Sequence, residues 1–264
     1  MFLSRLSRPA ALAVCALPVV ALLAVAGLVP LPFAVAQPGP TTDVLGEAAG
    51  KPVIEVHGAP TRDTSGKLRA VTISATGPGT SVHLGDVVDG WFRDDRAVMP
   101  YDSVYPSGGS TKDIERHNQQ EMKGSQDAAT QAALGYLGKQ SGKIEVDLQL
   151  GNVGGPSAGL LFSLGIVDLL DGDGSGGDLT GGRSIAGTGT IDDSGKVGPV
   201  GGVSLKVQAA HRDGATVFLV PRAECADAKA SAPKSMRLIP VTTLKGAVTD
   251  LTHLEKGGGS VPAC

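Results

Sequence analysis

The residues with the clearest potential for chemistry are a serine in a glycine-rich turn and a lysine 49 positions after it. Ser157 stands in the segment 154–159, GGPSAG, directly before a dense apolar run. If that run is a buried helix, Ser157 lies at its N-terminus, where unpaired backbone N–H groups can stabilise an oxyanion. A serine that only caps the helix would occupy the same position. A second residue is therefore needed to decide between nucleophile and cap.

Lys206 is the candidate partner because of the face of its helix on which it lies. Residues 203–212 are predicted to form a helix that Gly214 ends. At 100° per residue the polar side chains share one arc, which consists of Ser204, Gln208, His211 and Arg212. Lys206 falls on the opposite, apolar side, although a lysine that reaches along apolar surface to water would fit there too. Lys206 is thus predicted to point where the helix is buried, and His211 to point to solvent.

Burial would prepare Lys206 to act as a base. Desolvation disfavours the ammonium form, and the positive end of the helix that starts at Ser157 acts in the same direction, so the lysine pKa can fall from about 10.4 toward about 7. A neutral amine can then accept the serine proton. This Ser-Lys form of nucleophilic catalysis needs neither histidine nor aspartate. Ser157 and Lys206 are the predicted catalytic residues.

Two other functions fit part of the same sequence. The segment 155–159 also matches the G-x-S-x-G nucleophile elbow of lipases and esterases, which would make the chain a Ser-His-Asp hydrolase. His211 or His253 would be its base, and His57 would stand in an oxyanion loop. Only 107 residues follow Ser157, and His211 is predicted to face solvent, which disfavours this alternative. The alternative outside the enzymes is a catalytically silent peptide-binding module.

The elements that must position these residues alternate between strands and helices. Period-2 patterns and apolar runs predict strands at 53–56, 68–73, 143–150, 184–190 and 216–220, and helices at 111–137 (one helix or two), 160–170 and 203–212. Residues 171–176 are predicted to form a flexible turn, because Gly182 stands where a calcium loop needs a glutamate. Residues 192–195 are predicted to form a hairpin turn. The fold class is therefore α/β or α+β, with one compact domain after the N-terminal segment.

The composition excludes several kinds of partner. A net charge of -3 over 264 residues leaves no basic stripe for nucleic acid. Aromatic residues make up only 3% of the chain, which disfavours sites that stack bases or sugars. There is no CxxC, HExxH or paired Cys/His spacing, so neither a metal nor another cofactor is expected. None of the five Gly-Lys pairs is followed by serine or threonine as a Walker A loop requires, so ATP is not an expected partner either.

The N-terminal segment predicts export from the cytoplasm. After Arg8 no charged residue appears until Asp43, and most of that stretch is apolar. This pattern predicts a transmembrane anchor or signal segment over residues 1–36. The protein would be a single-pass protein of the cell membrane with an extracytoplasmic catalytic domain, or would be secreted if it is cleaved after Ala36. Residues 37–42, rich in proline, glycine and threonine, are expected to form a linker.

The cysteines fit an oxidising compartment. Cys15 lies inside the apolar N-terminal run, which leaves Cys225 and Cys264 beyond it. Two cysteines outside the cytoplasm favour a disulfide, and two unrelated thiols are the alternative. We therefore expect a bridge that ties the C-terminal tail to the segment after residue 220.

Three segments also carry a resemblance to a known family. Residues 155–159 (GPSAG), 186–191 (AGTGTI) and 197–206 (VGPVGGVSLK) resemble, in this order, the proteolytic domain of Lon proteases. The resemblance extends through 209–221 and covers about 120–255 of the chain.

The resemblance implies a role for each matching residue. Ser157 would be the nucleophile, Lys206 the general base, and Thr188 a hydroxyl that positions the lysine. The substrate would be a polypeptide, cleaved through an acyl-enzyme. Gly154 departs from the family, because many Lon proteases have an acidic residue there.

The N-terminal segment and the stretch 90–105 are similar to the membrane-anchored, extracytoplasmic Lon-like peptidases of bacteria. Those proteins usually carry a peptide-binding PDZ domain before the strand that leads to the serine, whereas only five residues separate Leu137 from Lys143 here. The predicted function is an ATP-independent serine endopeptidase, with assembly into homo-oligomers left open. The expected organisation is an anchor or signal at 1–36, an extracytoplasmic region at 37–119 that packs on the protease domain, a Lon-like proteolytic domain at 120–255 and a tail at 256–264.

Overall fold

The computed structural model describes residues 7–105, 111–139, 142–149 and 155–264. The chain falls into two compact units. Unit 1 comprises Met1–Ala36 and Ala75–Gly108, and unit 2 comprises Gln37–Ser74 and Gly109–Cys264. Unit 2 contains both Ser157 and Lys206, so the chemistry belongs to this unit.

A largely parallel sheet forms the centre of unit 2. Its order is β12-β11-β8-β5-β1, and the pairs β12/β11, β11/β8 and β8/β5 are all parallel. The strands are β1 (Phe33–Asp43), β5 (Lys67–Ala75), β8 (Ser184–Gly187), β11 (Val217–Pro221) and β12 (Arg237–Val241). Helices connect several of these strands, as the alternating sequence pattern predicted, and the mixed α/β class is confirmed.

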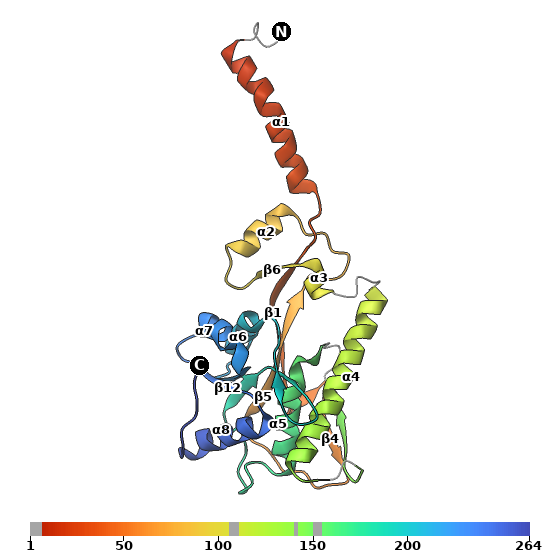
Figure 1. Cartoon of the computed structure of the whole chain (residues 1–264), viewed down its shortest axis with the longest axis vertical. Helices are drawn as coiled ribbons and strands as arrows, with labels where there is room; N and C mark the ends of the chain where they lie inside the picture. The colour runs from red at the N-terminus through yellow and green to blue at the C-terminus, as the bar shows by residue number, and fades with distance from the viewer. Residues whose placement is uncertain (1–6, 106–110, 140–141, 150–154) are drawn as a thin grey trace. The chain divides into compact units, whose positions relative to one another are not determined.

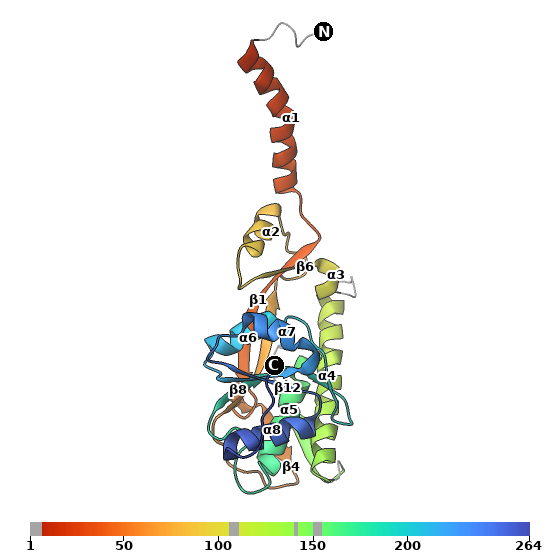
Figure 2. The same cartoon turned by 60° about the vertical axis from the view of Figure 1, so that its left-hand side comes forward.

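Helices cover both faces of this sheet. The alternate residues of strand β11 show which helices pack on each face. Neighbouring residues of a strand point to opposite faces. Val217 and Leu219 pack in the core cluster of α4, α5 and α8, whereas Phe218 and Val220 pack in the cluster of α6 and α7. Both views show α6 and α7 side by side (Figures 1 and 2). The helices are α4 (Thr111–Tyr136), α5 (Gly159–Leu170), α6 (Val203–Arg212), α7 (Cys225–Ser231) and α8 (Leu244–Lys256).

Helix α5 lies inside the core because all of its residues except Ser163 and Asp168 are apolar or glycine. All of its residues except Leu169 are buried. Gly165 allows a strand to approach it closely, since a Cβ atom there would lie 2.5 Å from Cδ1 of Ile54. The buried helix expected at 160–170 is confirmed.

Among the described residues, three two-stranded antiparallel sheets accompany the central sheet. The first, β9 with β10, forms the hairpin that was expected around residues 192–195. The second, β4 with β7, uses strands that are distant in sequence. Their bounds are β2 (Glu47–Ala48) with β3 (Lys51–Pro52), β4 (Ile54–His57) with β7 (Glu145–Leu148), and β9 (Thr190–Ile191) with β10 (Val197–Gly198).

Helix α4 is one continuous helix, so the helix expected over 111–137 is confirmed and its division into two is wrong. Gly124 and Gly135 lie within it, and each costs about 1 kcal/mol relative to alanine. The helix buries a face that includes Ala129, Ala133 and Leu134, and it packs along α5. This tertiary packing offsets the low helix propensity of the two glycines.

Residues 37–42 are not a linker, because they continue strand β1. Only residues 33–36 of β1 pair with β6 (Ala97–Pro100), so the later part of β1 has β5 as its neighbour in the sheet. Prolines are tolerated where a strand edge needs no N–H donor, which explains Pro38 and Pro40. Arg212 of α6 holds this part of the chain, since its Nη2 donates to the carbonyl oxygen of Gly39 at 2.8 Å.

Unit 1 contains the apolar N-terminal segment. Its elements are α1 (Arg8–Leu28), the start of β1, α2 (Leu84–Trp91), β6 and α3 (Tyr101–Val104). In the part of the chain that the structure describes, no helix has both the length and the apolar character needed to span a bilayer, and the expected anchor is not found. The apolar stretch is divided instead, because α1 ends at Leu28 and residues 33–36 enter a strand.

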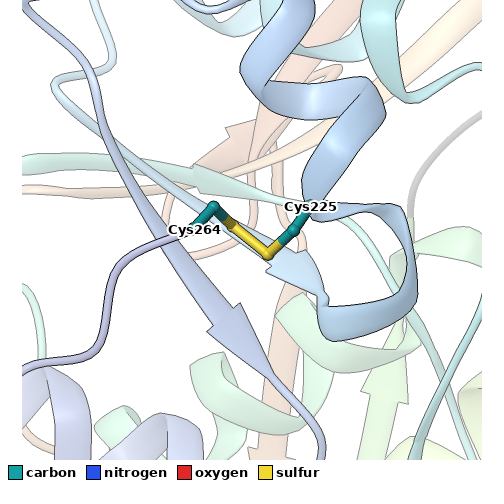
Figure 3. The surroundings of a disulfide bond; sticks show 2 residues. All are labelled: Cys225 and Cys264. Atoms are coloured by element: carbon teal, nitrogen blue, oxygen red, sulfur yellow. A yellow bond between two sulfur atoms is a disulfide. The ribbon is translucent and has the colours of Figure 1, made fainter.

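A disulfide joins Cys225 to Cys264, which confirms that expectation (Figure 3). Cys225 is the first residue of α7, and Cys264 is the last residue of the chain. The bridge closes over a separation of 39 residues and fixes the C-terminal tail beside α7.

Candidate active site

Ser157 lies in a short 3-10 turn, η2 (Pro156–Ala158), which runs directly into α5. The chain enters this turn through Gly155, whose φ of 91° is a conformation that other residues rarely adopt. The side chain of Ser157 lies at a half-exposed position, while Ala158 after it is buried. The predicted position of Ser157 at the start of a buried helix is therefore confirmed.

The turn that carries Ser157 is held from two sides. Gly189 N and Thr188 Oγ1 both donate to the carbonyl oxygen of Ser157, at 3.0 and 3.2 Å. On the other side, Ser125 Oγ of α4 donates to the carbonyl oxygen of Pro156 at 3.0 Å. These bonds fix the backbone on which the serine hydroxyl is mounted.

Lys206 is buried, as its place on the apolar arc predicted, and only 4% of its surface is exposed. Its helix, α6, begins after Gly202 and buries the same side of the wheel that the sequence indicated. His211 on the opposite arc is exposed. The amphipathic pattern of this single segment was enough to assign both side chains correctly.

Thr188 connects Lys206 to the serine turn. The Lys206 Nζ atom donates to Thr188 Oγ1 at 3.1 Å, and the same hydroxyl donates to the carbonyl oxygen of Ser157. Thr188 is completely buried, so its hydroxyl is shielded from bulk solvent. The structure thus brings Ser157, Thr188 and Lys206 together, from segments that are distant in the chain.

Burial lowers the pKa of Lys206 to about 8, and the nearby Glu224 carboxylate opposes this shift. At pH 7 a lysine with a pKa of about 8 is neutral in roughly one molecule in ten, against about one in 3,000 for an ordinary pKa of 10.5. The environment of Lys206 therefore increases the fraction of neutral amine by about 300-fold.

Glu224 is a residue near the site that sequence reasoning missed. It ends the short turn η3 (Arg222–Glu224), which follows strand β11, and its Oε2 atom is buried without a hydrogen-bond partner among the described residues. Burial raises the pKa of Glu224, and the charge of Lys206 opposes that rise. The available signal was an acidic residue three positions after a buried strand.

The histidines of the lipase hypothesis are not assembled around the serine. His57 in β4 lies 3.4 Å from Asp147 and 3.7 Å from Glu55, and His211 is exposed. His253 lies in α8, with a buried Nδ1 atom that has no partner in the described part of the chain. Among the described residues none of the three donates a hydrogen bond to Ser157 or accepts one from it.

The loop at 171–176 forms turns, as expected. Asp173 accepts hydrogen bonds from Ser175 and Gly177, and its carboxylate lies 2.9 Å from Nζ of Lys256. No group of three His, Cys, Asp or Glu side chains within the described ranges could hold a metal ion. Gly154, the departure from the Lon pattern, lies outside the described residues.

Comparison with known proteins identifies the domain that carries this site. The Lon protease (S16) C-terminal proteolytic domain family matches residues 122–252. Lon protease 1 of Myxococcus xanthus is 33% identical over 105 residues, which are 39% of this chain and 12% of that protein. Lon protease 2 of Herpetosiphon aurantiacus is 27% identical over 191 residues, which are 71% of this chain and 21% of that protein. Lon protease of Neorickettsia sennetsu is 34% identical over 99 residues, which are 36% of this chain and 11% of that protein.

The match includes every residue of the candidate site from Ser125 to Glu224. The chain spans between about a tenth and a fifth of the length of these relatives, so the match concerns their proteolytic domain alone. With its mixed α/β fold and this matched region, the chain belongs, through residues 122–252, to the family of the Lon protease C-terminal proteolytic domain.

Proposed function

We propose that this chain is a serine endopeptidase in which Ser157 is the nucleophile and Lys206 the general base. The observation that carries the proposal is the buried lysine whose amine donates to Thr188, the residue that also binds the backbone of Ser157. A buried amine with a pKa of about 8 has no evident structural purpose, because burying its charged form costs stability. Such a cost is typical of a catalytic group.

The reaction follows from these positions. The neutral amine of Lys206 accepts the proton of the Ser157 hydroxyl while Oγ attacks the carbonyl carbon of the scissile peptide bond. Backbone N–H groups at the start of the η2–α5 segment stabilise the oxyanion. The intermediate collapses to an acyl-enzyme, and the leaving amine takes the proton from Lys206. Water then attacks the ester through the same base, which restores the Ser157 hydroxyl and releases the acid.

Thr188 has a positioning role in this proposal. Its hydroxyl accepts the Nζ hydrogen bond, which restricts the lysine amine to the neighbourhood of the serine turn. It does not exchange a proton with substrate. The resemblance to Lon proteases implied this role, and the two hydrogen bonds support it.

The proposal extends to ATP-independent action outside the cytoplasm. Two observations support the compartment: the Cys225–Cys264 disulfide, which persists in oxidising environments, and the apolar N-terminal segment. Exposed side chains along α1, such as Leu12 and Leu28, support association of that segment with a membrane. Fusing a reporter that is active only after export to the C-terminus of the full chain tests the compartment, and a reporter that stays inactive would contradict it.

A serine-reactive fluorophosphonate probe tests the chemistry directly. Labelling that disappears in Ser157→Ala supports an enzyme, and the absence of labelling in the wild-type protein would support a silent binding module instead. Comparing matched peptide and ester substrates then separates a peptidase from a lipase-type hydrolase. A peptide library analysed by mass spectrometry gives the cleavage specificity.

A further inference from the structure

A groove runs between helix α4 and strand β7 in unit 2, and we call it the α4–β7 groove. It has a volume of about 350 Å³, at the small end of the range for ligand sites. Its lining includes Met122, Lys123, Gln126 and Asp127 of α4, and Val146 and Leu148 of β7. The proposed catalytic steps use none of these residues.

One wall of the groove is the edge of a strand. The only strand that pairs with β7, within the described residues, is β4 in a two-stranded antiparallel sheet. The register places Val56 opposite Val146, and the bond from Gln149 N to Val53 O makes Val53 and Gln149 a hydrogen-bonded pair three residues further along the ladder. Because such pairs alternate along an antiparallel ladder, the N–H and C=O groups of Val146 and Leu148 point away from β4.

The Gln126 side chain confirms this direction for Leu148. Its Nε2 atom donates to the carbonyl oxygen of Leu148 at 3.0 Å, so that outward carbonyl already accepts an amide N–H from the α4 side. The N–H and C=O groups of Val146 point the same way, two residues earlier in the strand. An edge with this spacing of donors and acceptors is complementary to the backbone of an extended polypeptide.

The groove adjoins the candidate nucleophile. Gln126 follows Ser125, whose hydroxyl donates to the carbonyl oxygen of Pro156, the residue before Ser157. One turn of α4 therefore contacts both the strand edge and the serine turn. A chain bound along the edge would lie beside the proposed site of cleavage.

We propose that an extended segment of the polypeptide substrate pairs with the outward edge of β7 in the α4–β7 groove, releases Gln126 from the carbonyl oxygen of Leu148, and becomes a third strand of the β4–β7 sheet. This inference rests on the proposed peptidase function and supplies a binding surface for its substrate. Main-chain hydrogen bonds give such pairing its affinity, and alternate side chains give it selectivity.

The groove also indicates which side chains it accepts. The apolar part of the lining includes Met122, Val146 and Leu148, and Lys123, Asp127 and Asp147 supply the charged groups. Two carboxylates against one ammonium leave a net negative charge. We therefore expect a segment with β-branched residues alternating with lysine or arginine to bind better than an acidic one.

The test removes the outward N–H of Val146 while leaving the ladder to β4 intact. Val146→Pro lacks that donor, and Val146→Ala is the matched control, since it also shortens the side chain but keeps the N–H. Both are made in full-length protein carrying Ser157→Ala, so that the peptide is not consumed. The probe is a fluorescein-labelled peptide of repeated Lys-Thr-Val-Thr units, and binding is measured by fluorescence anisotropy.

The expected result is binding that is about 5-fold weaker for Val146→Pro than for Val146→Ala, the change expected for one lost hydrogen bond. Equal affinity of the two variants, or no saturable binding to the Ser157→Ala protein, would overturn the inference. Hydrogen exchange supplies a second measurement if Val146→Pro fails to fold. Addition of the peptide should then slow exchange at residues 145–148 of the Ser157→Ala protein, and unchanged exchange there would refute pairing.

Failure of the groove proposal can be distinguished from failure of the proposed peptidase function. If the fluorophosphonate probe labels Ser157 but the two Val146 variants bind equally, the peptidase stands and the groove assignment is wrong. If the probe does not label the wild-type protein but Val146→Pro weakens binding, the peptidase proposal fails and the groove is the site of a peptide-binding module.

Discussion

Replacing Lys206 by methionine should make unit 2 more stable while it abolishes turnover. The side chain is 96% buried, and its pKa is about 8 in the folded protein against 10.5 for an ordinary lysine. A difference of about 2.5 pKa units corresponds to about 3 kcal/mol of lost stability when the lysine is protonated. Methionine has a similar length and no charge, so it removes this penalty.

The sign and the pH window of this effect follow from the two pKa values. Above about pH 10.5 the lysine is neutral in both states and costs nothing. As the pH falls from 10.5 to about 8, the unfolded chain takes up the proton and the folded protein does not, so the stability of the wild-type protein decreases. Below about pH 8 the full penalty remains. The penalty that Lys206→Met removes should therefore be largest near pH 7 and disappear near pH 11.

The net gain will be smaller than the full penalty. Methionine cannot donate to Thr188 or attract Glu224, and loss of one hydrogen bond costs about 1 kcal/mol. We expect a net increase of about 1 to 2 kcal/mol at pH 7, or several degrees in the melting temperature.

Urea unfolding of the wild-type and Lys206→Met proteins between pH 7 and pH 10 measures this difference. Lys229→Met is the matched control, because Lys229 is exposed and its loss should change stability little at any pH. Lys206→Arg keeps the buried charge and should be both inactive and no more stable than the wild type. A Lys206→Met protein that is less stable than the wild type at pH 7, or a difference that does not vary with pH, would refute the reasoning.

Three further predictions concern the same site and the disulfide. The pH profile of kcat/KM should rise with an apparent pKa near 8 as Lys206 loses its proton, and a midpoint near 10.5 would contradict a base in a buried environment. Thr188→Val should lower kcat by at least 10-fold with little change in KM, whereas Thr188→Ser should keep most of the activity because it retains the hydroxyl. Equal activity of the two variants would contradict the positioning role of Thr188. Reducing the Cys225–Cys264 bridge should cost up to about 4 kcal/mol of stability by the chain-entropy estimate, and should expose the tail to proteolysis before activity is affected. Mass spectrometry of unreduced, alkylated protein would exclude the bridge if both thiols carried the label.

The sequence predicted those features that depend on one short segment. The helix at 203–212 has the bounds expected from its periodicity, and the burial of Lys206 follows from its angle on that helix. Ser157 was placed at a helix start because a glycine-rich turn precedes an apolar run. In each case the spacing of polar and apolar residues along a single element determines which side chain is buried.

Other features depend on partners that lie far away in the chain, and there the sequence misled. Proline and glycine at 37–42 indicate a linker locally, but β5 and Arg212 provide hydrogen bonds that make this segment a strand. The sequence left open one helix or two over 111–137, and packing against α5 supports one. The apolar stretch within 1–36 was predicted to be an anchor or signal segment, and it is divided between a helix and a strand.

The sequence by itself indicated Ser157 and Lys206 as the candidate catalytic residues. It placed Ser157 at the start of a buried helix and Lys206 on the buried face of another. The tertiary structure decided how they are connected: Thr188 bonds to both, and the Glu224 carboxylate comes near Lys206. It also decided that the edge of β7 forms one wall of a groove beside the serine turn. The physical reason is that a helix fixes its own faces through local spacing, whereas hydrogen bonds, burial and electrostatic fields at a site arise between segments that meet only when the chain folds.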